Sequence, residues 1–154
     1  MIDNKYLGVN TPIIVDDIAF LSSDNLIFFN KTISLYYNCI FGVRDYNLLE
    51  SCVNSVINFH YYNNENDIIR LMTKTCASII YDHPFIDGNK RTAISSLFFL
   101  FGLNTNHFAD NQIINNITKL NKENLYNNTI LLAEKKIKEE DFCNYLKQNL
   151  IDCC

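Results

Sequence analysis

The sequence predicts an all-α protein, and three features support this fold class. Apolar residues recur at intervals of three and four over most of the chain, the pattern of helices buried on one face. Hydrophobic residues make up 48% and charged residues 19% of the 154 positions, a composition typical of a globular protein. The sequence contains neither an internal repeat nor a linker-like stretch. We therefore expect one domain over residues 1–154, with a core over about residues 20–150.

The N-terminal half of the chain shows two helical patterns, after a first dozen residues that are unassigned or extended. A first helix opens at the cap-forming residues Ser22, Ser23 and Asp24 and is broken by Gly42. Its apolar face consists of Leu26, Phe29, Ile33, Tyr36, Tyr37 and Ile40. A second apolar pattern consists of Leu48, Leu49, Cys52, Val56 and Phe59. The segment HYYNNEN, residues 60–66, lacks this period and is predicted to be a loop or a short hairpin.

The C-terminal half continues with the same period. A third helix begins at Asp67, and its apolar face consists of Ile69, Met72, Cys76, Ile79 and Ile80. A fourth ends at Gly102, and its apolar face consists of Ile94, Leu97, Phe98 and Phe101. Further helices are predicted near residues 110–120, 123–135 and 139–150. The last of these buries Phe142, Tyr145, Leu146 and Leu150.

Charge and composition exclude several classes of protein. The net charge of -4 and the pI near 5.3 argue against broad electrostatic binding of nucleic acid, so no direct nucleic-acid partner is expected. The start, MIDNKYLGVN, has no basic region leading into an apolar one. The longest apolar run, at about residues 97–103, is too short to span a membrane. A soluble protein of the cytoplasm is therefore predicted, with its many aromatic residues mostly in the core.

The six cysteines show neither a disulfide nor a zinc pattern. Four of them stand alone in apolar segments, while Cys153 and Cys154 are neighbours near the C-terminal end. There is no C-x-x-C pair, and none of the three histidines stands at zinc-like spacing from a cysteine. We expect reduced thiols that behave as small buried hydrophobic groups.

The segment HPFIDGNKR, residues 83–91, combines ionisable side chains with residues that redirect the backbone. Pro84 disfavours helical geometry at His83, so the third helix should end there. Gly88 permits an unusual backbone angle, and the next helix should begin at Asn89 or one residue later. The segment is therefore expected to form a tight loop that leads into the N-terminus of a helix.

The side chains of this segment are typical of phosphate and metal chemistry. A helix N-terminus attracts an anion through its unpaired N–H groups and its dipole. A bound anion would offset the unfavourable position of Lys90 and Arg91 in the first turn. Asp87 is a hard oxygen ligand that suits Mg²⁺ together with nucleotide phosphates. His83 is the only general base in the loop, and Phe85 would anchor the loop in the core.

Each of these residues, taken singly, also has an ordinary structural explanation. His83 would be a satisfied loop residue, and Asp87 would form an Asx turn or a helix cap. Lys90 and Arg91 would belong to a solvated helix face. Because all of these explanations would have to hold together within one short loop, the functional interpretation is favoured.

This segment resembles the signature of the Fic/Doc (Fido) family, H-P-F-x-[D/E]-G-N-[G/K]-R. The resemblance extends upstream to GVRDYNLLES (residues 42–51) and downstream to NKRTAISSLFFLFGLN (residues 89–104) and AEKKIKEEDFCNYLKQNL (residues 133–150). It is closest to death-on-curing (Doc) toxins. It implies an all-helical Fido fold with a short β-hairpin flap near the active-site loop. In such proteins the flap binds a target protein by pairing main chain to main chain.

The resemblance places this flap in NFHYYNNEN, residues 58–66. His60, Tyr61 and Tyr62 are then candidate contacts with the target, although a simple exposed loop explains the segment equally well. Strand addition of this kind needs few specific side chains, so the sequence offers little with which to decide.

The resemblance also implies a role for each residue of the motif. His83 would deprotonate a hydroxyl of the target protein, Asp87 would hold Mg²⁺, and Phe85 would anchor the loop. The residues implied to bind the nucleotide phosphates are Gly88, Asn89, Lys90 and Arg91.

Two departures from the family pattern point in opposite directions. Relatives that transfer AMP have Gly where this chain has Lys90, and a second Arg where it has Ile94. A Lys at this position is the Doc arrangement, in which ATP is turned round so that its γ-phosphate meets the hydroxyl. The Lys side chain fills space beside the loop and adds positive charge where the transferring oxygens become negative. Pro84 and Gly88, however, are more typical of the AMP-transferring relatives.

The resemblance therefore implies a Doc-like toxin that uses Mg·ATP to phosphorylate a hydroxyl of a target protein, such as the translation factor elongation factor Tu. Transfer of AMP, or a catalytically silent module that only binds, are the alternatives. Fic proteins often inhibit themselves through the motif [S/T]-x-x-x-E-[G/N], and none of the glutamates in this sequence has a Ser or Thr four residues before it. An antitoxin acting in trans is therefore the expected partner.

Overall fold

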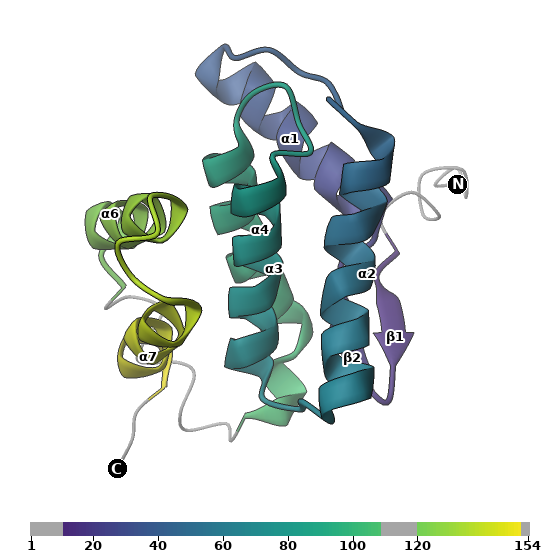
Figure 1. Cartoon of the computed structure of the whole chain (residues 1–154), viewed down its shortest axis with the longest axis vertical. Coiled ribbons are helices and arrows are strands. Elements are labelled where there is room, and N and C mark those ends of the chain that lie inside the picture. Colours follow the sequence, from purple (N-terminus) through teal and green to yellow (C-terminus); the bar gives the residue numbers. More distant parts are fainter. Residues whose placement is uncertain (1–10, 109–119, 152–154) are drawn as a thin grey trace, which may run out of the picture.

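The computed structural model describes residues 11–108 and 120–151, and these residues form a helical bundle with one small hairpin (Figure 1). The strands are β1 (Ile13–Val15) and β2 (Ile18–Phe20). The helices are α1 (Ser23–Tyr37), α2 (Tyr46–Asn63), α3 (Ile68–Asp82), α4 (Asn89–Leu103), the short 3₁₀ helix η1 (Thr105–His107), α6 (Lys122–Ala133) and α7 (Glu139–Leu150). The prediction of an all-α fold with a small hairpin is confirmed.

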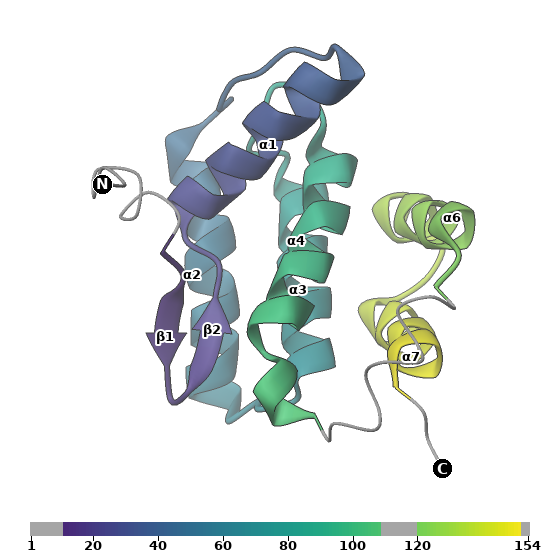
Figure 2. The ribbon, with the colours of Figure 1, turned by 180° about the vertical axis from the view of Figure 1, so that it is seen from behind.

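Helix α3 occupies the centre of the bundle. It packs against α2, α4 and α7, and the two opposite views of the ribbon show these helices around it (Figures 1 and 2). Its side chains are buried on nearly every side, and Cys76, Ile69 and Ile79 are fully enclosed. Because α3 ends at the motif loop and α4 begins directly after it, the central helix and one of its closest neighbours hold that loop between them.

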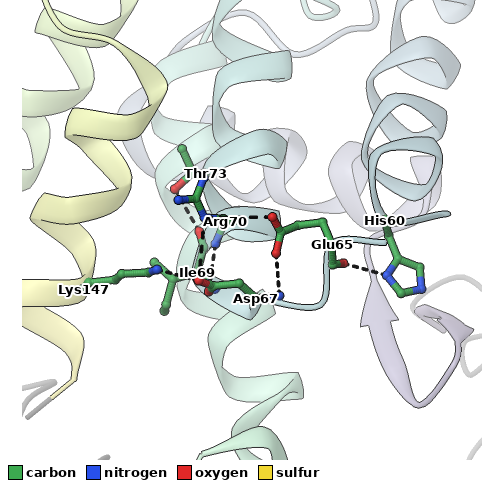
Figure 3. Close-up of polar contacts among 7 residues, drawn as sticks. All are labelled: His60, Glu65, Asp67, Ile69, Arg70, Thr73 and Lys147. Atoms are coloured by element: carbon green, nitrogen blue, oxygen red, sulfur yellow. Dashed lines mark hydrogen bonds and ion pairs between the residues drawn. The ribbon is translucent and has the colours of Figure 1, made fainter. Parts of the chain in front are cut away.

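Polar caps set several of the helix boundaries that the sequence predicts. Ser22 caps α1 in a capping box with Asn25, as expected for the first of the cap-forming residues. Asp67 caps α3 by accepting hydrogen bonds from two backbone N–H groups, and it also forms an ion pair with Lys147 of α7 (Figure 3). The start of α3 is therefore fixed to the last described helix of the chain.

Two helix ends differ from the prediction. Helix α1 stops at Tyr37, five residues before the expected break at Gly42, because Asn38 adopts a left-handed conformation and closes the helix. Helix α4 runs through Gly102 to Leu103, since a single helical glycine costs only about 1 kcal/mol. The predicted apolar face of α1 is also only partly buried, with Tyr36 and Ile40 80% and 64% exposed.

The prediction of a loop or short hairpin at residues 60–66 is wrong for residues 60–63 and correct for residues 64–66, and the flap implied at residues 58–66 does not form a hairpin. Residues 46–63 form α2, which ends where Asn64 takes a left-handed conformation. The helical period continues in this segment because His60 is buried, while Tyr61 and Tyr62 lie on the exposed face. The hairpin is formed instead by β1 and β2, whose two-residue turn has positive φ at both positions. It lies beside the C-terminal end of α2, away from the motif loop (Figure 1).

The remaining predictions for the described residues have mixed outcomes. Cys52, Cys76 and Cys143 are buried and free, as predicted, while Cys39 is half-buried and free. None of the helices in the described parts of the chain has the length and apolar character needed to cross a membrane. The helix predicted near residues 110–120 and the last two cysteines fall outside the described residues.

His60 connects the hairpin to the end of α2. Its Nδ1 lies 2.8 Å from the carbonyl oxygen of Glu65 (Figure 3), and its Nε2 lies 3.0 Å from Oδ2 of Asp16. Because both partners can only accept hydrogen bonds, the ring satisfies both of them only in its protonated form. The Glu65 carbonyl first, and the Asp16 carboxylate second, raise the pKa of His60 above its ordinary value.

We expect this protonated bridge to make stability fall as the pH rises. A histidine whose pKa is raised by folding contributes its full stabilisation below the unfolded-state pKa of about 6.5 and loses it as the pH passes the folded-state pKa. Urea unfolding between about pH 5.5 and about pH 8.5 should show a decrease that His60→Gln flattens. His107→Gln, at an exposed histidine, is the control and should keep the decrease. An identical pH dependence in His60→Gln and the parent would contradict the bridge.

Candidate functional site

The motif residues form a tight loop between α3 and α4, held in place by the connection between α1 and α2. Val43 pairs with Phe85 in an isolated antiparallel bridge. The N–H of Ile86 donates to the carbonyl of Gly42 at 2.9 Å, and the N–H of Arg44 donates to the carbonyl of Pro84 at 2.7 Å. Two segments that are about 40 positions apart in the sequence therefore run side by side as a short two-stranded ribbon.

His83 ends α3 in a left-handed conformation with φ of 48°, as Pro84 predicts, and its side chain is exposed. Arg44 holds this turn. Its Nε donates to the carbonyl of His83 at 2.7 Å, and its Nη2 donates to the carbonyl of Asp82 at the same distance. The guanidinium thus caps the last turn of α3 and restrains the backbone of the histidine.

Phe85 and Asn89 close the loop from within. The ring of Phe85 is 1% exposed and lies in the main core. The side-chain amide of Asn89 accepts a hydrogen bond from the N–H of Phe85 at 3.0 Å and donates to its carbonyl at 2.9 Å. Because its side chain is committed to the loop backbone, any phosphate contact from Asn89 would come from its main-chain N–H.

Asn30 of α1 supports the loop from the other side. This buried residue donates to the carbonyl of Asp87 at 2.8 Å and contacts Oγ1 of Thr92 in α4 at 3.3 Å. Gly88 has φ of 74°, a conformation that favours glycine. A Cβ there would lie 3.4 Å from Nδ2 of Asn30, so a larger residue would press on this support.

The N-terminus of α4 has the character of an anion site. Its N-cap is Gly88, which has no side chain to cap the helix, so the N–H groups of the first turn are available to a ligand. The guanidinium of Arg91 lies 4.0 Å from the centre of the Tyr37 ring. The carboxyl pKa of Glu134 is lowered by the hydrogen-bonded Lys136 and, to a smaller degree, by the charge of Lys90.

Asp87 is exposed, and its Oδ1 accepts a hydrogen bond from the N–H of Gly88 at 2.7 Å. This bond joins adjacent residues, so it is neither an Asx turn, which reaches two residues on, nor a cap of α4. Within residues 11–108 and 120–151, no three His, Cys, Asp or Glu side chains gather in a way that could hold a metal ion. A single exposed carboxylate fits Mg²⁺ only where nucleotide phosphates supply further oxygens, which is the usual donor set for this ion.

His60, Tyr61 and Tyr62, the predicted flap contacts, are not brought to this loop. They lie in the last turns of α2, whereas the first turn of α2 follows the segment that pairs with the loop. The segment beside the loop is residues 42–44, which belongs to the stretch GVRDYNLLES quoted for the family resemblance. Arg44 and Asn30 were missed, because each acts on residues far away in the sequence and neither has a local pattern around it.

The helical bundle and its loop define a protein with a candidate nucleotide-phosphate site at a helix N-terminus. The sequence model of the Fic/DOC family matches residues 20–101, which is more than half of the chain. The chain belongs to the Fic/DOC family, whose members are generally transferases that modify proteins and generally use ATP and Mg²⁺. No curated protein matches the sequence.

Proposed function

We propose that this protein is a Doc-like phosphotransferase that moves the γ-phosphate of ATP to a hydroxyl of a target protein. The observation that carries the proposal is the loop itself, in which an exposed His83 precedes an uncapped helix N-terminus by six residues. A base and an anion site at the two ends of one rigid loop suit the transfer of a phosphoryl group to a hydroxyl.

In this reaction His83 accepts the proton of the target hydroxyl while the hydroxyl oxygen forms a bond to the γ-phosphorus. The bond between that phosphorus and the β–γ bridging oxygen breaks, and ADP leaves with the bonding electrons. The N–H groups of Asn89 and Lys90, with the side chain of Arg91, stabilise the negative charge on the phosphate oxygens, while the N–H of Gly88 is donated to Oδ1 of Asp87. When bound, Mg²⁺ would neutralise phosphate charge, and Asp87 is the residue that would hold it.

Lys90 and Ile94 favour transfer of phosphate over transfer of AMP. Lys90 adds a cation in the first turn of α4, beside the groups that would hold the transferring phosphate. Ile94, one turn further along, provides no charge for a distal phosphate. If ATP binds with its γ-phosphate at the loop, Lys90 lies beside that phosphate and no distal phosphate needs a cation at Ile94.

The connection between α1 and α2 is the segment that we expect to bind the target, in place of residues 58–66. One edge of residues 42–44 pairs with the loop, as a strand would. Beside it, the side chains of Ile40 and Phe41 are 64% and 45% exposed. An extended peptide could add to this segment through its main chain and bring a hydroxyl towards His83. Elongation factor Tu is the target that the likeness to Doc toxins suggests.

An antitoxin acting in trans is part of the same proposal. The self-inhibitory motif of Fic proteins is missing from the printed sequence. A growth-inhibiting transferase without that motif would need control by another protein. Coexpression with the product of a neighbouring short gene would then restore growth.

The proposal is tested by determining which phosphate of ATP is transferred to the target. Incubation with a bacterial lysate should label a target band from γ-labelled ATP and leave it unlabelled from α-labelled ATP. Lys90→Gly should lower the γ-label by a factor on the order of 100, the usual effect of removing one group that stabilises transition-state charge. Lys90→Met keeps most of the side-chain volume, so comparing the two variants separates charge from space.

Each contrary result has a definite meaning. Label from α-labelled ATP in the parent protein would replace phosphate transfer by AMP transfer. The absence of label from both forms of ATP, in a lysate that contains the target, would leave a binding module without activity.

A further inference from the structure

Lys135 lies in the connection between α6 and α7, close to the end of α3 that carries His83. Its Nζ lies 5.4 Å from the centre of the Tyr81 ring, and Tyr81 precedes the exposed His83 by two residues. Helices α6 and α7 pack on the side of α3 away from α2, as the two views of the ribbon show (Figures 1 and 2). The cation–π contact therefore holds the ammonium of Lys135 near the end of α3.

The backbone at Lys135 has a conformation that lysine seldom adopts. Its φ is 56°, in the left-handed region where glycine and asparagine are favoured at the end of a helix. The N–H of Lys135 donates to the carbonyl of Leu132 at 3.0 Å, and the N–H of Lys136 donates to the carbonyl of Leu131 at 2.9 Å, so this position closes α6. A side chain kept in an unfavourable conformation beside a candidate site indicates a functional role for that side chain.

Arg44 and Lys135 place two cations beside His83, from two different connections between helices. Arg44 comes from the connection between α1 and α2, and its Nε donates to the His83 carbonyl at 2.7 Å. Neither cation forms an ion pair with a carboxylate in the described parts of the chain. The neighbouring Lys136, in contrast, pairs with Glu134 at 2.7 Å. The positive charge of Arg44 and Lys135 is therefore available to a ligand.

The carboxylates around the end of α3 have other partners. Asp82 is half-buried, and its Oδ2 accepts a hydrogen bond from the thiol of Cys52 at 3.5 Å. Glu139 pairs with Lys74 at 3.9 Å, and Asp87 is the residue that would hold Mg²⁺. Because the whole chain has a net charge of -4, an acidic ligand is repelled by most of the surface and attracted at this place.

We propose that the surface between Arg44 and Lys135 binds an acidic segment of the target protein, an inference that rests on the proposed phosphotransferase function. The hydroxyl that reacts at His83 then lies in a stretch that carries Asp or Glu within a few positions. Exposed charges at the rim of a site act mainly on the rate of encounter and on the choice of partner. Lys135 is therefore a residue that determines target specificity, and it does not take part in the chemical step.

Peptide binding in the absence of nucleotide tests this inference apart from catalysis. The probe is a short fluorescein-labelled peptide with one threonine between glutamates, and its control has glutamines in place of the glutamates. Fluorescence anisotropy should show that the glutamate peptide binds at least about tenfold more tightly in about 0.1 M salt. The difference should vanish in about 1 M salt, where the Debye length falls from about 10 Å to about 3 Å.

Two variants of Lys135 assign this binding to its charge. Lys135→Asn places asparagine in a backbone conformation that it adopts readily, so the fold is kept, and the affinity for the glutamate peptide should fall about threefold to fivefold. Lys135→Glu should lower it at least about tenfold. Lys122→Glu, at an exposed lysine in the first turn of α6, makes the same change in net charge at the opposite end of that helix and is the matched control.

The affinity of both Lys135 variants for Mg·ATP should be unchanged. A weaker affinity for Mg·ATP would assign the lysine to the nucleotide phosphates and overturn the inference. Equal binding of the two peptides in low salt, or an equal loss in Lys122→Glu and Lys135→Glu, would also overturn it. If the parent protein still transfers γ-label in a lysate in that case, the proposed function stands without the acidic segment. Selective peptide binding by a protein that transfers no label would keep the surface and remove the proposed reaction.

Discussion

Alanine at position 83 is expected to abolish phosphate transfer and to relieve the growth arrest that expression of the parent protein causes in bacteria. His83 is exposed at the end of α3, and no other side chain of the loop can take a proton from a hydroxyl near neutral pH. Loss of a general base costs roughly 10²–10⁴-fold in rate, which is enough to remove a toxic effect. Growth curves and transfer of γ-label, measured together, check this result.

Two further variants keep the His83 result interpretable. The backbone at His83 has φ of 48°, a conformation that asparagine tolerates well. His83→Asn should therefore keep the loop intact and still be inactive, since an amide cannot act as the base. His107→Ala, at an exposed histidine of η1, should remain toxic and active. Full toxicity in both His83 variants would remove the histidine from the mechanism, and harmless expression of the parent would favour a silent binding module.

Phe85→Ala should cause the largest loss of stability within the motif. The ring is 1% exposed and lies among the core residues, and deleting a buried phenylalanine ring typically costs about 3–5 kcal/mol. A loss of this size is a large part of the 5–15 kcal/mol by which proteins of this kind are usually stable. Urea unfolding followed by circular dichroism measures the loss directly.

The neighbouring Ile86 provides the control for this measurement. Its side chain is 54% exposed in the same loop, so Ile86→Ala should change the free energy of unfolding by no more than about 0.5 kcal/mol. Phe85→Leu should fall between the two, because leucine refills part of the space. Equal effects at positions 85 and 86 would show that the ring does not anchor the loop.

Local sequence signals were sufficient to predict where the motif loop begins and ends. Pro84 ended α3 at His83, and the following helix began at Asn89, because both boundaries depend on the backbone preferences of adjacent residues. The burial of Phe85 could be predicted because a large apolar side chain within a polar loop is stabilised by packing in the core. The helical periods of α1, α2, α3 and α7 were visible for the same kind of reason.

The parts that were missed depend on contacts between distant residues. Residues 60–63 are polar and aromatic, and they are helical because His60 is buried against the hairpin and Asn64 ends the helix later than expected. Nothing near Arg44 or Asn30 in the sequence shows that they reach the loop, since these bonds span 39 and 57 positions. The contact between Lys135 and Tyr81 likewise exists only because α6 packs against α3.

The bond between Asn30 and Asp87 has a consequence for the timing of activity during synthesis. A chain on the ribosome grows from its N-terminus, and the loop receives its support from Asn30 only after Asp87 and Thr92 have been made. A nascent fragment that stops before α4 contains His83 but lacks both the amide of Asn89 and the helix N-terminus. The site is therefore completed only when more than half of the chain has been translated, so early-terminated products carry the histidine without the site.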